Sequence, residues 1–219
     1  MENNTSVSAP NSSGVNLIDA NSTYIDSSVK IGKNVTIYPN NYILGNTVIG
    51  DNCTIMPFNI ISNCKIGNGV KISFSQLEES EVKNNVTIGP FAQLRPGSTI
   101  DEKCKVGNFV EIKNATLSNG TKASHLAYIG DAQIGSNCNI GCGSIFVNYN
   151  GSEKFKTKVG NNCFIGSNAN IIAPVNIADN SYICAGSTLT IDTNENDFVI
   201  ARVRETVKPN RASKYLKKH

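Results

Sequence analysis

The sequence predicts an all-β fold, a solenoid built from hexapeptide repeats. Between residues 159 and 189, aliphatic side chains recur at a strict step of six, at Val159, Ile165, Ile171, Ile177, Ile183 and Leu189. An α-helix would need a period near 3.6 and a flat strand a period of 2, whereas a step of six is typical of hexapeptide β-solenoids. A small or β-branched side chain stands four residues after each aliphatic, at Cys163, Ala169, Val175, Ser181 and Ser187. Each hexad therefore predicts one short strand and one corner, with both of these side chains facing the interior.

The same period extends through most of the chain and predicts one elongated repeat domain over residues 15–191. It runs from Ile25 to Ile61, shifts by one residue at Ile66, and shifts again before Val82. These shifts predict corners of irregular length. Residues 73–81 are the weakest part of the repeat, because Glu78 stands where an aliphatic side chain is due. Stacked coils bury one another's faces, so such a domain holds together with a narrow core.

The two ends of the chain depart from the repeat. Residues 1–14 are rich in Asn and Ser and nearly free of apolar side chains, which predicts a disordered segment. After Leu189 the repeat stops, and residues 192–219 are expected to form an extended arm. The end of this arm, residues 208–219, holds four lysines and one arginine. It is expected either to cap the open end of the solenoid or to contact a phosphorylated ligand.

The composition argues against several classes of function. Twenty Lys and Arg against 17 Asp and Glu give a net charge of +3, which argues against nucleic-acid binding. No apolar run is long enough to span a membrane, and the N-terminus lacks the features of a signal peptide. Seven cysteines, an odd number, occur without a Cys-x-x-Cys motif, and five of them fall in small interior positions: Cys53, Cys64, Cys104, Cys138 and Cys163. Packing explains these five better than disulfides or metal, and a reducing cytoplasm is the expected location.

The first chemical feature is a pair of cations, Arg95 and Lys113, each directly after a hexad aliphatic. They are 18 residues apart, which is three hexads. If three hexads make one turn, the two side chains stack on one face about 4.8 Å apart, the spacing of neighbouring strands. Like charges so close repel unless an anion lies between them. The pair is therefore either a phosphate clamp or two solvated surface cations beside Glu111, and the spacing alone favours neither.

The second feature is His125. The only other histidine of the sequence, His219, is the last residue. A lone histidine is more often a structural hydrogen-bonding group than a catalytic base. His125 follows Lys113 by 12 residues, two hexads, which places it on a different face of the coil. A site shared with the cation pair would need a neighbouring subunit or a favourable corner.

The third feature is a break in the period at residues 147–158. Phe146 and Val159 are 13 residues apart, and no aliphatic side chain stands near position 152. The stretch is polar and basic and carries Tyr149 and Phe155. An inserted loop on a regular scaffold is often a functional site. The three lysines and two aromatic residues of this stretch make a plain surface excursion the less favoured explanation.

The motifs around these features resemble one family. They are Gly-Pro-Phe-Ala-Gln-Leu-Arg-Pro-Gly at 89–97, Val-Gly-Asn-Phe-Val-Glu-Ile-Lys at 106–113, Lys-Ala-Ser-His-Leu-Ala-Tyr-Ile-Gly-Asp at 122–131, Asn-Tyr-Asn-Gly at 148–151 and Lys-Phe-Lys-Thr at 154–157. The family is the acetyltransferase (C-terminal) half of the bifunctional N-acetylglucosamine-1-phosphate uridyltransferase/glucosamine-1-phosphate N-acetyltransferase. The resemblance covers residues 14–202. It implies a left-handed parallel β-helix that forms a homotrimer.

The same resemblance implies an activity and a set of site residues. The activity is acetyl transfer, without a metal, from acetyl-CoA to the amine of glucosamine 1-phosphate, a step of UDP-N-acetylglucosamine synthesis for the bacterial cell envelope. By position, His125 matches the general base, Arg95 and Lys113 the sugar-phosphate ligands, and Tyr128 and Asn139 sugar-binding residues. Acetyl-CoA positions match Asn148, Tyr149, Ser167, Ala185 and Arg202. The family's uridyltransferase half has no counterpart in the sequence, so no uridyl transfer is expected from this chain. The chain is either an excised half of such an enzyme or a stand-alone acetyltransferase, for which a separate uridyltransferase is a possible partner.

The resemblance also implies a role for the backbone N–H of Cys142, which would face the thioester and stabilise the oxyanion. The family commonly has Ala at this position. The Cys142 side chain is expected to pack against the coil. We therefore expect direct attack by the amine, assisted by His125, and regard a covalent acetyl-cysteine at Cys142 as the less favoured route.

Three other functions are alternatives for a hexapeptide solenoid. A γ-type carbonic anhydrase shares the solenoid but needs three histidines on zinc, and the repeat holds one. A non-catalytic scaffold or ice-binding surface would show a regular row of Thr, whereas the outward positions are irregular and charged. An acetyltransferase for another amino sugar, such as a nucleotide-linked one, stays open as the alternative acceptor.

Overall fold

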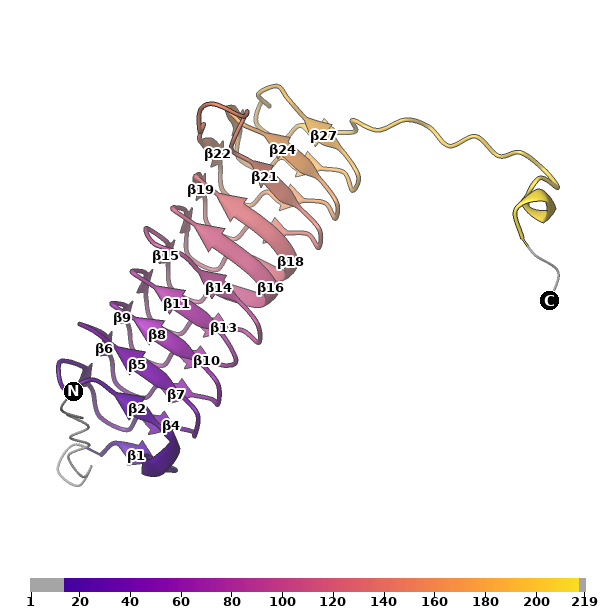
Figure 1. Ribbon diagram of the computed structural model, residues 1–219. Coiled ribbons are helices and arrows are strands. Elements are labelled where there is room, and N and C mark those ends of the chain that lie inside the picture. Colours follow the sequence, from indigo (N-terminus) through magenta and orange to yellow (C-terminus); the bar gives the residue numbers. More distant parts are fainter. Residues whose placement is uncertain (1–13, 217–219) are drawn as a thin grey trace.

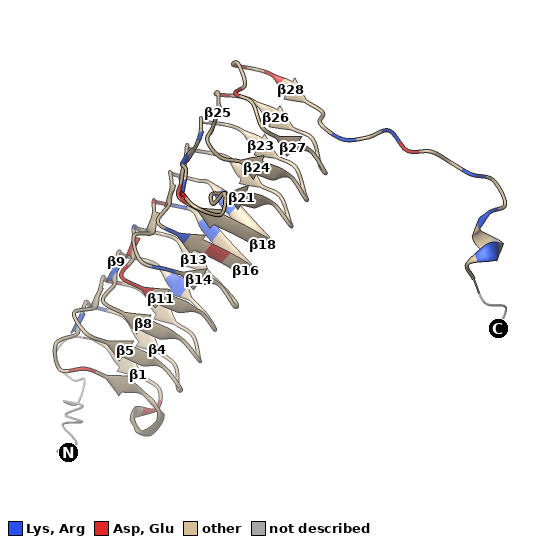
Figure 2. Cartoon of the chain, turned by 45° about the horizontal axis from the view of Figure 1, so that its top comes forward, with Lys and Arg blue, Asp and Glu red and all other residues tan. Residues whose placement is uncertain are grey.

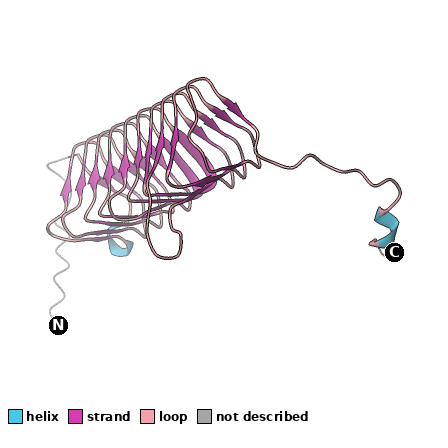
Figure 3. Cartoon of the chain, turned by 90° about the horizontal axis from the view of Figure 1, so that it is seen from above, coloured by secondary structure: helices cyan, strands magenta, loops and turns pink. Residues whose placement is uncertain are grey.

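The chain forms a long three-sided prism in which short coils stack along one axis (Figures 1 and 3). This computed structural model describes residues 14–216, so the disordered segment expected at residues 1–14 lies almost wholly outside it. The strands pair in parallel with those of the preceding and following coils. The predicted hexapeptide solenoid is therefore confirmed.

Each coil contributes short strands to three walls. Wall 1 holds β1 (Asn16–Leu17), β4 (Thr36–Ile37), β7 (Thr54–Ile55), β10 (Lys71–Ile72), β13 (Thr87–Ile88), the starts of β16 (Lys105–Lys113) and β18 (Lys122–Gly130), β20 (Asn139–Ile140), β23 (Phe164–Ile165), β26 (Tyr182–Ile183) and β28 (Phe198–Val199). Wall 2 holds β2 (Tyr24–Ile25), β5 (Tyr42–Leu44), β8 (Ile60–Ser62), β11 (Gln76–Glu78), β14 (Gln93–Leu94), the ends of β16 and β18, β21 (Ile145–Val147), β24 (Asn170–Ile172) and β27 (Thr188–Leu189). Wall 3 holds β3 (Lys30–Ile31), β6 (Val48–Ile49), β9 (Lys65–Ile66), β12 (Glu81–Val82), β15 (Thr99–Ile100), β17 (Thr116–Leu117), β19 (Ala132–Ile134), β22 (Thr157–Val159) and β25 (Val175–Ile177).

The register between coils explains the shifts of the sequence period. Regular coils pair residues 18 apart, as in Ile25 with Ile43. Where a corner is shorter the step falls, so that Ile49 pairs with Ile66 and Lys71 with Thr87. The expectation for residues 73–81 was wrong, because Leu77, one residue before Glu78, is the fully buried side chain of β11. The corner before Leu77 has lost one residue, which moves the interior position forward without breaking the wall.

The core is one continuous cluster of interior side chains, contributed by all three walls, that runs along the prism axis. The largest fully buried side chains belong to the predicted aliphatic positions, such as Ile55 and Ile100. The five cysteines predicted at small interior positions are buried and unpaired. Burial raises the pKa of Cys64 and of Cys104 to about 11, so these thiols stay protonated at neutral pH.

The corner between walls 1 and 2 carries an exposed apolar ridge, which we call the corner ridge. Its members have positive φ, a conformation that bulky residues rarely adopt. Neighbouring phenyl rings lie 5.5–5.7 Å apart, and stacking of this kind offsets part of the backbone cost. All five side chains remain exposed to solvent in the single chain. The corner ridge consists of Phe58, Phe74, Phe91, Phe109 and Leu126.

The irregular segments lie at the ends and at one insertion. The inserted loop spans 148–156, because Val147 belongs to β21 and Thr157 and Lys158 belong to β22. The stack also continues past the predicted end at Leu189, because β28 pairs with β26. Short 3₁₀ helices occur at Ala20–Ser22 and Ala212–Lys214, and the tail leads away from the prism (Figure 1). Within residues 14–216, we find no helix with the length and apolar character needed to cross a lipid bilayer.

Candidate active site

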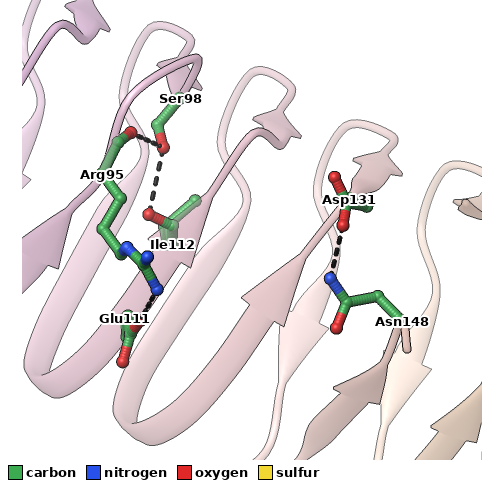
Figure 4. Close-up of polar contacts among 6 residues, drawn as sticks. All are labelled: Arg95, Ser98, Glu111, Ile112, Asp131 and Asn148. Atoms are coloured by element: carbon green, nitrogen blue, oxygen red, sulfur yellow. Dashed lines mark hydrogen bonds and ion pairs between the residues drawn. The ribbon is translucent and has the colours of Figure 1, made fainter. Parts of the chain in front are cut away.

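Arg95 and Lys113 occupy equivalent places on adjacent coils, where wall 2 turns toward wall 3. The register pairs Leu94 with Ile112, and the Arg95 N–H donates to the Ile112 carbonyl at 2.8 Å. Arg95 also forms an ion pair with Glu111, with 2.9 Å between Nη1 and Oε1 (Figure 4). Both side chains are partly exposed, so the ion pair stabilises the fold by less than about 1 kcal/mol, and an anionic ligand can compete for Arg95.

Lys154 of the inserted loop joins these two residues, and we call Arg95, Lys113 and Lys154 the cation cluster. Contact with the Lys154 ammonium is the first cause that lowers the pKa of Lys113, followed by burial, while the nearby Asp131 opposes the shift and Arg95 adds to it. Cations held this close to one another favour a bound anion. The sequence period places Lys154 in the inserted stretch but indicates no role for it, because a period says nothing about where an insertion folds back.

A buried carboxylate, Asp131, lies beside the cation cluster. Its Oδ1 accepts a hydrogen bond from Asn114 Nδ2 at 2.5 Å, and its Oδ2 accepts one from Asn148 Nδ2 (Figure 4). Burial acts to raise the pKa of Asp131. The bonds from Asn114 and Asn148, with the charges of Lys113 and Lys154, outweigh burial and hold that pKa below its usual value. Asp131 is therefore an anion at neutral pH. Figure 2 shows charges of both signs on the coils around β16 and β18.

Tyr128 lies on wall 2 close to the cation cluster. Its register partners are Glu111 on the coil below and Ile145 on the coil above. The Tyr128 hydroxyl covers Gly130, since a Cβ added at Gly130 would lie 2.6 Å from that hydroxyl and 2.8 Å from Asn148 Nδ2. Glycine at position 130 thus allows Tyr128 and Asn148 to approach each other above the coil.

A second group of predicted residues lies at the edge of wall 1, and we call it the wall 1 column. The pairings of Lys122 with Asn139 and of Tyr128 with Ile145 place Cys142 directly above His125. The pairings of the next two coils place Ser167 above Cys142 and Ala185 above Ser167. The Arg202 guanidinium donates to the Ala185 carbonyl and continues the line. The column consists of His125, Cys142, Ser167, Ala185 and Arg202.

His125 is exposed and oriented by one neighbour. Its Nδ1 lies 2.6 Å from Asn108 Oδ1 on the coil below. An amide oxygen only accepts hydrogen bonds, so Nδ1 carries the proton and Nε2 is left as the basic nitrogen. Asn139, the predicted sugar-binding residue of wall 1, lies exposed on β20, one coil further along the stack than His125.

The structure does not bring all the predicted residues together within one chain. Arg95, Lys113 and Tyr128 belong to wall 2, whereas His125 and Asn139 belong to wall 1, across the corner ridge. Among the predicted acetyl-CoA residues, Tyr149 is exposed on the inserted loop, but Asn148 is buried and its Nδ2 is engaged by Asp131. The expectation for the Cys142 side chain was wrong: it is exposed, because it stands on the outer side of its corner.

Comparison with known proteins identifies the repeat. The sequence pattern described as bacterial transferase hexapeptide (six repeats) matches residues 28–63, 46–75, 79–114 and 156–190, which together make up more than half of the chain. The chain belongs to the bacterial transferase hexapeptide family. Its members share the coil geometry described above, so membership accounts for the walls and corners but not for the ligand.

Curated relatives within this hexapeptide family carry the name bifunctional protein GlmU. The chain is 55% identical over 197 residues to the protein from Caldicellulosiruptor saccharolyticus, which covers 90% of this chain and 42% of the relative. It is 54% identical over 205 residues to the protein from Staphylococcus epidermidis, covering 94% and 45% of the two chains. The chain thus spans less than half the length of these relatives. These matches confirm the resemblance drawn from the motifs.

A solved structure supports the fold. The UDP-N-acetylglucosamine acyltransferase LpxA from Bacteroides fragilis superposes with a TM-score of 0.55 at 21% identity, covering 81% of this chain and 69% of that one. This likeness concerns the fold alone, a left-handed parallel β-helix. Within residues 14–216, no group of three or more His, Cys, Asp and Glu residues is arranged to hold a metal ion.

Proposed function

We propose that the chain transfers the acetyl group of acetyl-CoA to the amine of glucosamine 1-phosphate. The observation that carries this proposal is that the site has two parts. One is the wall 1 column, a line of mostly small side chains that ends at the basic imidazole of His125, and the other is the cation cluster. The wall 1 column offers an extended ligand a path from Arg202 to His125. The cation cluster offers a phosphate three positive charges. GlmU relatives that match about 90% of the chain support the proposed activity.

The active unit is a homotrimer in this proposal. Walls 1 and 2 meet at a convex edge, so one chain cannot enclose a sugar phosphate between His125 and Lys113. If three chains meet along their corner ridges, wall 1 of one copy faces wall 2 of the next. Such packing buries the exposed phenyl rings of Phe58, Phe91 and Phe109. Each cleft would then hold the wall 1 column of one copy and the cation cluster of its neighbour.

The chemistry follows from these positions. The cation cluster holds the phosphate and orients the amine, which is an effect of positioning. His125 Nε2 removes a proton as the amine attacks the thioester carbonyl, the tetrahedral intermediate collapses, and the CoA thiolate leaves. The backbone N–H of Cys142 stabilises the oxyanion while it exists. Tyr128 and Asn139 contact the sugar. Acetyl-CoA is contacted by Tyr149, Ser167, Ala185 and Arg202. Asn148 contributes its side-chain oxygen to acetyl-CoA, because its Nδ2 is engaged by Asp131.

The product, N-acetylglucosamine 1-phosphate, would serve UDP-N-acetylglucosamine synthesis. A cytoplasmic location agrees with the seven unpaired cysteines. The proposal is tested by measuring CoA release from acetyl-CoA with glucosamine 1-phosphate and, separately, with a nucleotide-linked amino sugar. Faster turnover of glucosamine 1-phosphate supports the proposal. Preference for the nucleotide-linked acceptor would replace it with the alternative acetyltransferase.

A further inference from the structure

Asp131 is hydrogen-bonded to both ends of the inserted loop. At the start of the loop, its carboxylate accepts a hydrogen bond from the Asn148 side chain. At the end of the loop, its carbonyl accepts a hydrogen bond from the Thr157 N–H at 3.2 Å. The Phe155 N–H donates to the Asn148 carbonyl at 2.8 Å and closes the loop between these two ends. One buried residue therefore determines where a nine-residue insertion, 148–156, leaves and rejoins the prism.

Asp131 is also tied to the coil that carries Lys113. Its N–H donates to the Lys113 carbonyl at 3.0 Å, and its Oδ1 accepts from Asn114 on the same coil. The carboxylate thus connects the coil of Lys113 with the loop of Lys154. On the preceding coil, the uncharged Asn114 occupies the corner position that is equivalent to Asp131. The corner therefore forms without a charge, and coil geometry does not explain why position 131 carries a carboxylate.

We propose that Asp131 is a positioning residue that fixes the inserted loop so that Lys154 stands beside Lys113 and completes the cation cluster. The inference rests on the proposed function for the identity of the anion, a sugar phosphate. Like-charged lysines separate unless something holds them, and Asp131 holds them through backbone contacts, through Asn148 and through its own charge. The loop would otherwise be free to move Lys154 away from the phosphate.

The groups that face Lys113 allow the electrostatic part to be tested separately. They are Arg95 from the preceding coil, Glu111 from the same strand β16, Tyr128 from the following coil, Asp131, and Lys154 from the loop. Asp131 is the group that acts to raise the pKa of Lys113 against its cationic neighbours. Removing its charge should therefore lower the pKa of Lys113 further, and phosphate binding should weaken at a lower pH than in the unmodified protein.

The test variant is Asp131→Asn, which suits this corner. Position 131 has φ of 47° and the equivalent Asn114 has φ of 46°, so asparagine adopts the required backbone conformation. The amide keeps one acceptor and loses the charge. Asp192→Asn is the matched control, because exposed Asp192 likewise accepts two bonds from an asparagine, Asn176, yet lies near none of the cluster residues.

We expect Asp131→Asn to raise KM for glucosamine 1-phosphate by about 10- to 100-fold, the effect of losing a hydrogen bond to a charged group, with a smaller change in kcat. The pH at which KM begins to rise should move downward, and trypsin should cut faster after Lys154 and Lys156. Asp192→Asn should change none of these. The proposal is overturned if trypsin sensitivity, KM and its pH dependence all match the control. It is equally overturned if only the melting temperature falls.

The trypsin measurement separates this inference from the proposed function. If the unmodified protein fails to acetylate glucosamine 1-phosphate, the proposed function is wrong, but faster cleavage at Lys154 in Asp131→Asn would still establish the loop anchor. If the unmodified protein is active and Asp131→Asn keeps both its loop protection and its KM, the anchor is wrong and the proposed function stands. Asn148→Ala, which removes one contact only, should give a smaller increase in cleavage than Asp131→Asn.

Discussion

The wall 1 column and the cation cluster are built in opposite ways. The column follows the strand register of wall 1, and four of its members, from His125 to Ala185, occupy equivalent positions on successive coils. The cluster arises from an interruption, because Lys154 reaches Lys113 only through the inserted loop. A regular solenoid offers a straight path for an extended ligand, whereas a compact charged group needs side chains that converge. The predictions below separate the two regions by their effects on kcat and KM.

The largest effect is expected in the wall 1 column. In the proposed mechanism, Nε2 of His125 accepts the proton from the attacking amine, so His125→Ala should lower kcat by about 10²- to 10⁴-fold. KM for acetyl-CoA should change little, because the remaining column residues are intact. The measurement is steady-state CoA release at saturating substrates. Turnover near that of the unmodified protein would remove His125 from the role of base.

Next in size are changes in the cation cluster. Lys113→Ala and Lys154→Ala should each raise KM for glucosamine 1-phosphate by about 10- to 100-fold, since each would remove a proposed charged partner of the phosphate. Lys158→Ala is the control, because Lys158 belongs to β22 on wall 3, just after the inserted loop, and lies outside the cluster. If KM for glucosamine 1-phosphate in Lys113→Ala and Lys154→Ala is no higher than in Lys158→Ala, the cluster does not bind the phosphate.

Two glycine substitutions should affect the regions differently. A Cβ at Gly107 would lie 1.9 Å from the backbone carbonyl oxygen of Ser124, next to His125. Relieving this clash would require the paired strand to shift, which costs stability. Gly107→Ala should therefore lower the free energy of unfolding by about 1–3 kcal/mol. At Gly130 the added atom meets the side chains of Tyr128 and Asn148 rather than backbone, so Gly130→Ala should lower stability by less than Gly107→Ala, while KM for the sugar phosphate rises roughly two- to tenfold. Chemical denaturation and kinetics of both variants check this; equal stability losses would contradict it.

The smallest effect is expected from Cys142→Ala. The proposed oxyanion donor is the backbone N–H, which the substitution keeps, so kcat should stay within about threefold of the unmodified value. The exposed thiol makes the covalent route a real alternative. Loss of turnover in Cys142→Ala, together with an acetylated Cys142 detected by mass spectrometry after mixing with acetyl-CoA alone, would favour that route.

The fold could be predicted from the sequence because a solenoid repeats one local pattern, a buried side chain every six residues, along the chain. Interior positions such as Ile55 and Ile100 followed directly from the step of six. Leu77 was missed because one corner residue is absent before it, and a fixed period cannot register a change in corner length. The strand β28 was missed because only Val199 fills an interior position there, too little for a period to detect.

The candidate site was predictable only where it depends on register. The 18-residue spacing was enough to place Arg95 and Lys113 on adjacent coils. The role of Asp131 and the position of Lys154 depend on how an irregular loop folds back, which no spacing encodes. The burial of Asn148 against Asp131 also depends on tertiary structure. From the sequence alone, a polar residue in an inserted loop is expected to be exposed.

The most direct test of a site shared between two copies is complementation. His125→Ala and Lys113→Ala are each expected to be nearly inactive at a low concentration of glucosamine 1-phosphate. When the two variants are unfolded together and refolded as mixed trimers, some clefts should pair an intact column with an intact cation cluster, and activity should return to a measurable fraction of the unmodified level. Mixed trimers no more active than the separate variants would contradict the shared site.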